Sequence, residues 1–193
     1  PVWVAMEYRY MPPVAQFRKQ ILSGDIGPLK MLNIREHRFP FLEKVQDWNR
    51  FNEKSGGTLV EKCCHFFDLM RLLTQSEVTR VYASTGQDNN HLDETYDGKT
   101  PDIIDNAYVI VDFNSGQRAC LDLNMFAEGS RYQEEICAIG PQAKIECFVP
   151  GPGRFWPEKT LGPAPIPKVV LSPRHPKGPI EADIPVDETL LEA

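Results

Sequence analysis

The chain has 193 residues, of which 41% are hydrophobic and 25% are charged, and its formal net charge at pH 7 is −6. This size suits one globular domain with its own core, so we expect a single domain over residues 1–193. The acidic balance and the lack of a Lys/Arg run argue against a nucleic-acid partner. No apolar run approaches the about 18 residues of a membrane span, and the first ten residues do not resemble a signal peptide, so we predict a cytoplasmic protein with no membrane partner.

The first predicted elements are a strand, a helix and a second strand. Residues 2–10 (VWVAMEYRY) have the β-branched and aromatic content of a strand. Pro12 and Pro13 suit the start of a helix, which the SGDIG segment ends. Residues 29–39 then alternate as a strand with one covered side. Leu29, Met31 and Asn33 fall on one face of this strand, and Lys30, Leu32 and Ile34 fall on the other.

A second predicted helix carries the candidate site. Residues 39–57 lack a sustained period and are rich in turn formers, which predicts a long loop that covers a site. A helical period follows from Thr58 to Thr74. Its apolar stripe consists of Leu59, Cys63, Phe66, Phe67, Met70 and Leu73. A second ridge places Glu61, His65, Asp68 and Leu72 along one edge of the same helix.

The second ridge suits proton transfer, because a carboxylate beside a histidine holds the imidazole in one tautomer and raises its basicity. Glu61 and His65 are four residues apart and are therefore the candidate catalytic pair. The same spacing also fits an ordinary surface pair of a helix, which is worth a few tenths of a kcal/mol. The spacing alone leaves both interpretations open.

Other chemistry in this helix is disfavoured. Consecutive helical residues point about 100° apart, so Cys63, Cys64 and His65 cannot close on one ion and we expect no metal site. The same angle points Cys64 and His65 away from each other, so we do not expect them to act as a nucleophile and its base. Lys62 is expected to face solvent or a loop edge, in a structural role.

The second half of the chain favours an antiparallel meander. After a strand at 78–84 and a polar loop, NAYVIVDF and QRACLDLNMF flank the connection NSG, and EEICAIG and AKIECFV flank PQ, which predicts two hairpins. Ten of the seventeen prolines lie between Pro150 and Pro185, so residues 150–193 are predicted to be extended, with strand character only in KVVL. The five cysteines are interpreted as reduced thiols that serve as small buried hydrophobes.

Taken together, the order of these elements predicts an α+β fold. Its mostly antiparallel, open-faced sheet would carry helices on one face, because runs of strands that follow helices favour such a layer.

Four segments in the same order resemble the C-terminal domain of the Gfo/Idh/MocA oxidoreductases, the glucose-fructose oxidoreductase and inositol dehydrogenase family. The first segment runs from EYRYMPP through SGDIG to KMLNIR. The second is DWNR followed by SGGTLVEKCCHFFDLMRLL, the third is DNAYVIVDFNSGQRACL, and the fourth is EICAIGPQAKIECF. The resemblance spans most of the chain.

The resemblance implies an NAD(P)-dependent dehydrogenase that acts on a sugar, inositol or a related polyol. This chain would be its substrate-binding and oligomerisation domain, and it would form a homo-oligomer through the sheet face. The GxGxxG motif and the family's EKP lysine do not occur in the sequence. We therefore expect that the N-terminal nucleotide-binding domain is absent, that the chain alone binds neither NAD nor NADP, and that it is inactive alone.

By the same resemblance, His65 acts as an acid or base with Glu61, which stands where the family usually has Asp. Four further positions match family motifs that border the substrate pocket, although they also suit loop anchors and core aromatics. These residues are Arg9, Tyr10, Trp48 and Arg50. The alternative function is a non-catalytic binding or dimerisation module derived from that family.

Overall fold

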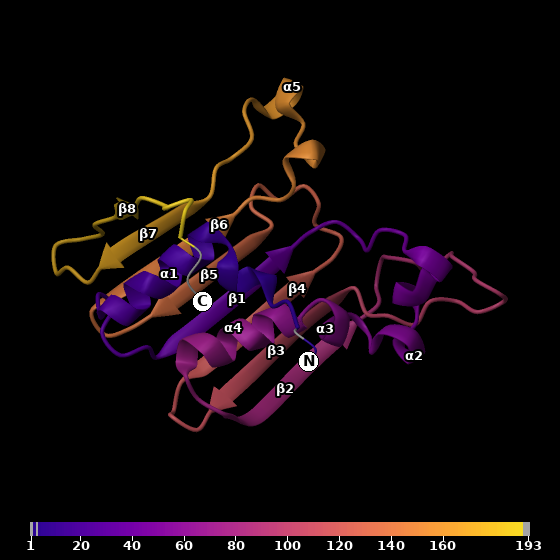
Figure 1. Ribbon diagram of the computed structural model, residues 1–193, viewed down its shortest axis with the longest axis horizontal. Helices are drawn as coiled ribbons and strands as arrows, with labels where there is room; N and C mark the ends of the chain where they lie inside the picture. The colour runs from indigo at the N-terminus through magenta and orange to yellow at the C-terminus, as the bar shows by residue number, and fades with distance from the viewer. Residues whose placement is uncertain (1, 3, 191–193) are drawn as a thin grey trace.

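The computed structural model describes residue 2 and residues 4–190, and its strands form one eight-stranded sheet in the order β2-β3-β4-β1-β5-β6-β7-β8 (Figure 1). The strands are β1 (Met31–His37), β2 (Val78–Gly86), β3 (Asn106–Phe113), β4 (Arg118–Asn124), β5 (Glu134–Ile139), β6 (Ala143–Val149), β7 (Lys168–Pro173) and β8 (Ala182–Ile184). The helices are α1 (Pro12–Ser23), α2 (Asn52–Ser55), α3 (Thr58–Glu61), α4 (Cys64–Thr74) and α5 (Glu158–Leu161), with 3-10 helices η1 (Glu7–Tyr10), η2 (Val45–Arg50) and η3 (Gly153–Phe155).

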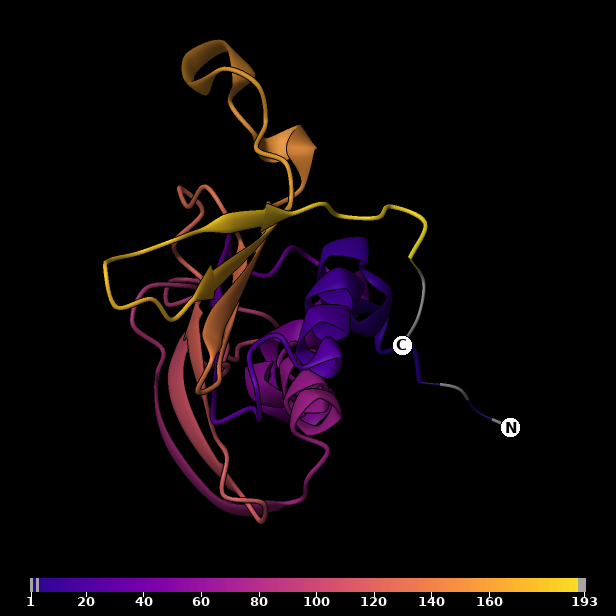
Figure 2. The ribbon, with the colours of Figure 1, turned by 90° about the vertical axis from the view of Figure 1, so that its left-hand side faces the viewer.

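The helices α1 and α4 lie on one face of the sheet, and the other face is open (Figure 2). All neighbouring strands pair antiparallel except β1 with β4, which are parallel. This arrangement confirms the predicted α+β fold with a mostly antiparallel, open-faced sheet. None of the described helices has a stretch long and apolar enough to cross a membrane.

Helix α1 forms where the double proline and the SGDIG segment predict it. Pro12 and Pro13 lie in the first turn, where a missing N–H costs no helical hydrogen bond. Gly24 ends the helix in the left-handed region, with φ of 89°. Val14 and Phe17 are buried, and the helix packs over β6 and β7. The apolar side chains therefore fix α1 on one half of the sheet.

Strand β1 has the one-sided burial that its alternation predicts. Leu32 and Ile34 are buried, whereas Met31 and Asn33 are exposed. The same alternation continues to Glu36, which is 0% exposed. The strand thus delivers a carboxyl group into the interior at its carboxyl end.

The prediction of a strand at residues 2–10 is wrong for the described residues of that segment. Residue 2 and residues 4–6 are irregular, and Glu7–Tyr10 is the 3-10 helix η1. Tyr8 is only 5% exposed because its ring packs against Phe66 of α4, with ring centroids 5.2 Å apart. The segment therefore forms a tight 3-10 turn that buries Tyr8 in place of the expected strand.

The predicted meander is interrupted. The hairpins β3–β4 and β5–β6 form as predicted, but β1 lies between them, parallel to β4 and antiparallel to β5. Local alternation and turn residues predict that two strands adjacent in sequence pair as a hairpin. The insertion of β1 between the two hairpins depends instead on contacts between distant segments. Both edges of β1 are thereby hydrogen-bonded inside the sheet.

The predicted helix from Thr58 to Thr74 is two helices, α3 and α4, separated by a turn at Lys62 and Cys63. The N–H of Cys63 donates to the carbonyl of Thr58, five residues back, at 3.3 Å. An α-helix bonds four residues back, so the extra residue rotates α4 relative to α3. Glu61 and His65 consequently do not lie on one continuous helical ridge.

The Pro-rich segment is partly as predicted. The strand β7 contains the KVVL sequence, and β8 is a short strand that was not foreseen. Between β6 and β7, residues 150–167 form an arm with η3 and α5 that projects beyond the sheet (Figures 1 and 2).

All five cysteines are free thiols, but the interpretation as buried hydrophobes holds only for Cys63 and Cys147, because Cys64, Cys120 and Cys137 are half-buried. Burial raises the pKa of Cys63 and Cys147, and burial together with the charge of Glu146 raises the pKa of Cys137 to about 11. These thiols remain protonated at neutral pH and serve in packing.

Candidate functional site

The candidate site lies at one end of the sheet, which we call the rim. The carboxyl end of β1 and the start of β5 meet there, since β1 and β5 are antiparallel neighbours. The helix η1 and the beginning of α4 lie beside them (Figure 1). Four chain segments that are far apart in sequence thus bring their side chains together.

His65 occupies the first turn of α4 and packs on Tyr8, with ring centroids 5.2 Å apart and planes inclined by 33°. Its Nδ1 atom is buried and has no hydrogen-bond partner in the part of the chain that the structure describes. Glu61 therefore does not bond to this nitrogen. A buried imidazole nitrogen without a partner is costly, which is a reason to consider it for binding or proton transfer.

Tyr8 connects His65 to buried charges. Its hydroxyl donates to Glu134 Oε1 at 2.6 Å and accepts a hydrogen bond from Lys62 Nζ at 2.8 Å. Lys62 Nζ also lies 3.0 Å from Glu36 Oε1. These four residues, Tyr8, Glu36, Lys62 and Glu134, are called the buried network below. They tie η1, β1, β5 and the turn before α4 together.

Lys62 lies in the turn between α3 and α4, but the expectation that its side chain faces solvent is wrong. Its side chain is only 11% exposed, and its ammonium lies over the rings of Tyr8 and Phe66, 4.9 and 5.5 Å from their centroids. The expectation assumed one continuous helix from Thr58 to Thr74. The turn at Lys62 and Cys63 interrupts that helix and so changes the direction in which the Lys62 side chain points.

The buried network contains more negative than positive groups. Glu36 is 0% and Glu134 is 2% exposed, and Arg38 adds a second cation 3.3 Å from Glu36 Oε1. Burial, followed by the charge of Glu36, raises the pKa of Glu134. Burial and the charges of both carboxylates also raise the pKa of Tyr8. The environment of the network therefore favours the protonated forms of Glu134 and Tyr8.

Arg9 and Tyr10 flank this network on η1. Arg9 binds Asp68 of α4 with two hydrogen bonds, from Nε at 2.6 Å and from Nη2 at 2.5 Å. This bidentate pair positions η1 against α4. Tyr10 is 37% exposed, so its ring is available at the surface.

Arg50 and Trp48 lie in η2, within the predicted covering loop. Arg50 is 2% exposed, and its Nε donates to Glu94 Oε2 at 2.9 Å. Burial would raise the pKa of Glu94, but hydrogen bonds from His91, Tyr96 and Arg50 outweigh it and lower that pKa to about 2. Arg50 thus anchors the polar loop after β2, while Trp48 is half-buried.

Asp105 anchors the other end of the polar loop. It is 2% exposed and accepts the backbone N–H groups of Asp88, Asn89 and Asn90 at 3.1, 2.8 and 2.7 Å. Burial raises the pKa of Asp105, but these hydrogen bonds outweigh it and lower the pKa. Residues 88–90 of the loop are therefore held by the carboxylate of Asp105.

Sequence reasoning missed Glu36, Glu134 and the inward position of Lys62. Alternation offered a signal for the two acids, because each continues a buried face: Glu36 follows Leu32 and Ile34, and Glu134 precedes Ile136 and Ala138. An acid at a core position of a strand is unusual unless it is paired.

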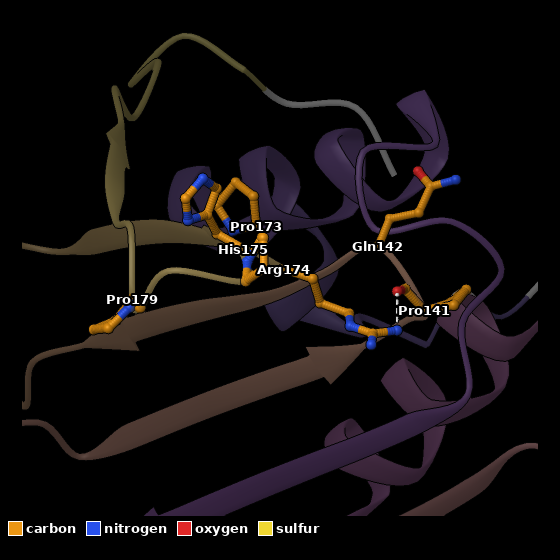
Figure 3. Close-up of a pocket in the computed structure, with 8 residues that line it drawn as sticks. Pro141, Gln142, Pro173, Arg174, His175 and Pro179 are labelled. Carbon is orange, nitrogen blue, oxygen red and sulfur yellow. Dashed lines mark hydrogen bonds between the residues drawn. The ribbon is translucent and has the colours of Figure 1, made fainter.

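A separate hollow lies at the opposite end of β6 and β7, between the turn Pro141–Gln142 and residues 173–179 (Figure 3). Arg174 Nη1 donates to the carbonyl of Pro141 at 3.1 Å, and His175 is exposed. This hollow contains none of the candidate site residues, which makes His175 a useful control.

Comparison with known proteins gives consistent matches. Residues 18–140 match the family model GFO_IDH_MocA_C, described as the oxidoreductase family, C-terminal alpha/beta domain. The Bacillus subtilis protein YteT, which is named as an oxidoreductase, is 31% identical over 84 residues, covering 42% of this chain and 20% of YteT.

Two solved structures share the fold. An oxidoreductase from Thermotoga maritima is 16% identical, with a TM-score of 0.68 over 95% of this chain and 48% of its own. Levoglucosan dehydrogenase, in complex with NADH and L-sorbose, is 15% identical, with a TM-score of 0.64 over 94% of this chain and 46% of its own. The chain therefore spans about half the length of these two solved proteins.

Proposed function

The chain belongs to the Gfo/Idh/MocA oxidoreductase family, whose C-terminal alpha/beta domain it matches, and from this we propose that it forms the substrate-binding wall of an NAD(P)-dependent dehydrogenase acting on a sugar or related polyol. The observation that carries the proposal is the position of His65. Its imidazole lies at the rim against Tyr8, with a buried Nδ1 that has no partner within the described chain. Such a nitrogen suits a general acid or base for a substrate hydroxyl.

In the proposed site, His65 holds or releases the hydroxyl proton. Tyr8 fixes the imidazole plane from one side, and hydrogen bonds to Glu134 and from Lys62 fix the Tyr8 ring in turn. Glu61, on α3, assists at the same rim. It makes no hydrogen bond with His65 among the described residues, so we propose that it contacts a substrate hydroxyl directly.

The other predicted pocket residues divide into two roles in this proposal. Tyr10 and Trp48 have free aromatic surface and border the substrate. Arg9 and Arg50 already bind Asp68 and Glu94, so they shape the border by fixing η1 and the covering loop. An arginine paired with a carboxylate mainly positions the segments that it joins, and it has little free charge to offer a substrate.

The described residues do not fit a dinucleotide cofactor. A pyrophosphate is usually held where a strand leads through a glycine-rich turn into a helix. Here β1 is followed by the long covering loop and β4 by the segment that leads to β5, so neither strand of the parallel pair enters a helix in that way. We propose that NAD or NADP binds outside the part of the protein described by this structure.

Sugar binding at His65 provides the direct test. Saturation-transfer NMR of this chain with L-sorbose and inositol at millimolar concentration is expected to show transfer to at least one ligand. Replacing His65 with alanine should abolish the transfer because the rim loses its hydrogen-bonding imidazole. Replacing His175, in the distant hollow, should leave it unchanged. Equal transfer in both variants would remove His65 from the site.

The open sheet face supports a second candidate function, self-association. Tyr82, Tyr108 and Ile110 are 64%, 61% and 48% exposed and lie next to one another across β2 and β3. Contiguous apolar side chains on an open face mark an interaction surface. We propose that a second copy of the chain covers this face, which would serve an enzyme or a non-catalytic module equally.

Replacement of Tyr108 by glutamate tests this association. Light scattering is expected to report an oligomer for the unchanged chain and a monomer for the variant, because a buried unpaired carboxylate is costly. Glutamate at exposed Leu22 of α1, on the helical face, is the control. A strict monomer of the unchanged chain at high concentration contradicts the proposal.

A further inference from the structure

The open face of the sheet (Figure 2) carries an exposed patch on one half and a recess on the other. The patch, called the tyrosine patch below, consists of Tyr82, Tyr108 and Ile110 on β2 and β3. The recess has a volume of about 150 Å³ and lies over β1, β5 and β6. The side chains that line it include Arg35, Glu135, Cys137, Glu146 and Phe148. A projection and a recess on one face are the elements of a self-complementary surface.

Strand pairing places the tyrosine patch and the recess at the same levels along the strands. Two rows of open-face side chains cross the sheet from β2 to β6. The first row is Ser84, Tyr108, Asp122, Arg35, Glu135 and Phe148. The second row is Tyr82, Ile110, Cys120, Asn33, Cys137 and Glu146. The tyrosine patch and the recess are therefore built from the same two rows.

A two-fold axis that runs along the strands, between β4 and β1, would bring the tyrosine patch of each copy over the recess of the other. Such an axis lies in the interface and keeps each row at its own level. It sets β4 opposite β1, β3 opposite β5 and β2 opposite β6 of the second copy. Ile110 would then enter the recess beside Cys137 of the second copy. Sheets that pack face to face keep their strands within about 30° of each other, so the rows stay matched near the axis.

The tyrosine hydroxyls of the patch suit the carboxylates of the recess. With this axis, Tyr108 would lie opposite Glu135 of the second copy, and Tyr82 would lie opposite Glu146. Each of these carboxylates already pairs with a cation of its own chain. A carboxylate has about four acceptor positions, so each keeps room for a tyrosine hydroxyl. The tyrosine patch would therefore gain hydrogen-bond acceptors as well as apolar cover.

The charges in the middle of the sheet determine where the axis runs. Asp122 of β4 and Arg35 of β1 are neighbours in register. An axis along β4 would bring two Asp122 carboxylates together, and an axis along β1 would bring two Arg35 guanidinium groups together, both of which are costly. An axis between these strands sets Asp122 of each copy opposite Arg35 of the other. An axis between β1 and β5 would set Arg35 opposite Glu135, but it would also set Asp122 against Phe148.

Three other basic groups on the open face have acidic partners in their own chain. His37 Nε2 lies 3.3 Å from Asp122 Oδ1. Arg80 and Lys144 would lie opposite each other at the periphery of the interface, and each is within 2.7 Å of a carboxylate of its own chain. Because these charges are paired and solvent reaches the periphery, their mutual repulsion is weak.

We propose that two copies of the chain pack through their open faces about a two-fold axis between β4 and β1, with reciprocal ion pairs between Asp122 of one copy and Arg35 of the other. This inference deepens the proposed self-association and rests on it. Each contact occurs twice in such an interface, so the four charges beside the axis alternate in sign. Charged groups arranged in this way fix the register of the two copies.

Two single charge reversals test this arrangement. In Arg35→Asp all four of these charges are negative, and in Asp122→Arg all four are positive. Each variant is expected to weaken self-association by about a hundred-fold, because like charges then face each other across the interface. In a mixed dimer of the two variants, two negative groups of one copy face two positive groups of the other. Light scattering of the mixture is therefore expected to report a dimer that neither variant forms alone.

The recovery in the mixture separates contacts between copies from effects within one chain. Each variant keeps its own pair of like charges after mixing, so a change in the stability of the single chain does not restore the dimer. Arg71→Asp, which reverses an exposed charge of α4 on the helical face, is the matched control and should leave self-association unchanged. Circular dichroism verifies that each variant is folded, and Asp122→Lys takes the place of an Asp122→Arg variant that does not fold.

The outcomes separate this inference from the proposed self-association. If the unchanged chain is a strict monomer at high concentration, both are overturned. If it is an oligomer but the mixture of variants stays monomeric, only the reciprocal ion pairs and their axis are overturned. An oligomer that persists in either single variant overturns them as well. Recovery of Arg35→Asp by Glu135→Arg, and not by Asp122→Arg, would place the axis between β1 and β5 and likewise contradict the inference.

Discussion

Replacing Lys62 with methionine is expected to lower the free energy of unfolding by about 3–5 kcal/mol. Methionine has a similar volume, so the loss comes from the charge. Lys62 lies 3.0 Å from Glu36, which is 0% exposed, and donates to the hydroxyl of Tyr8. Without it, the buried carboxylate of Glu36 keeps only its longer contact with Arg38, and Glu134 loses the favourable charge of Lys62. Urea denaturation measures the change, with Lys30→Met as the exposed control.

The pH dependence of this loss distinguishes charge from packing. The native pKa of Glu134 is raised by burial and by Glu36, and Lys62 lowers it. The native state therefore binds its proton more tightly than the unfolded state. The stability from this group is present below the unfolded pKa, about 4.3, and is lost as pH rises through the native pKa. In the Lys62→Met variant the native pKa of Glu134 rises further. The decrease in the free energy of unfolding should therefore be small near pH 4 and largest above pH 7. A loss independent of pH would contradict the charge explanation.

Replacing Asp105 with alanine is expected to cost about 3–4 kcal/mol. Its carboxylate accepts three consecutive backbone N–H groups, those of Asp88, Asn89 and Asn90, which would be left without acceptors. Thermal and urea unfolding measure the cost. Asp112→Ala is the control, because Asp112 pairs with the exposed side chain of Arg80 and such surface pairs contribute about 1 kcal/mol or less.

Lowering the pH should reproduce part of the stability loss expected for Asp105→Ala. The native pKa of this carboxyl is lowered by its hydrogen bonds, which outweigh burial. Its stabilisation is therefore present above the unfolded pKa, about 3.9, and is lost as pH falls through the native pKa. The stability difference between the unchanged chain and Asp105→Ala should narrow below pH 4. A constant difference from pH 7 to pH 3 would show that the hydrogen bonds to the charged form are not its cause.

The parts of the fold that sequence predicts are those set by local pattern. Helix α1 follows from Pro12, Pro13 and Gly24, and the hairpins β3–β4 and β5–β6 follow from alternation around short turns. The place of β1 in the sheet could not be predicted in this way, because pairing with β4 and β5 depends on packing between distant segments.

The candidate site was less predictable for a related reason. The family motif indicates His65, but the buried network depends on the turn at Lys62 and Cys63, where the hydrogen bond shifts from four to five residues. A helical wheel assumes a constant phase and therefore places Lys62 outside. The alternation of β1 and β5 does contain a signal for Glu36 and Glu134, whereas their meeting with Tyr8 depends on tertiary structure.

The insertion of β1 between β4 and β5 has a consequence for how the chain acquires this fold. Residues 31–37 are synthesised before their partners at 118–124 and 134–139. Until then both edges of this strand lack their ladder partners, a state that invites pairing with other chains. Closing such distant contacts is also slow, because the entropy of the intervening loop is lost before the contacts form. The nascent chain is therefore expected to need shielding by chaperones until β5 is synthesised.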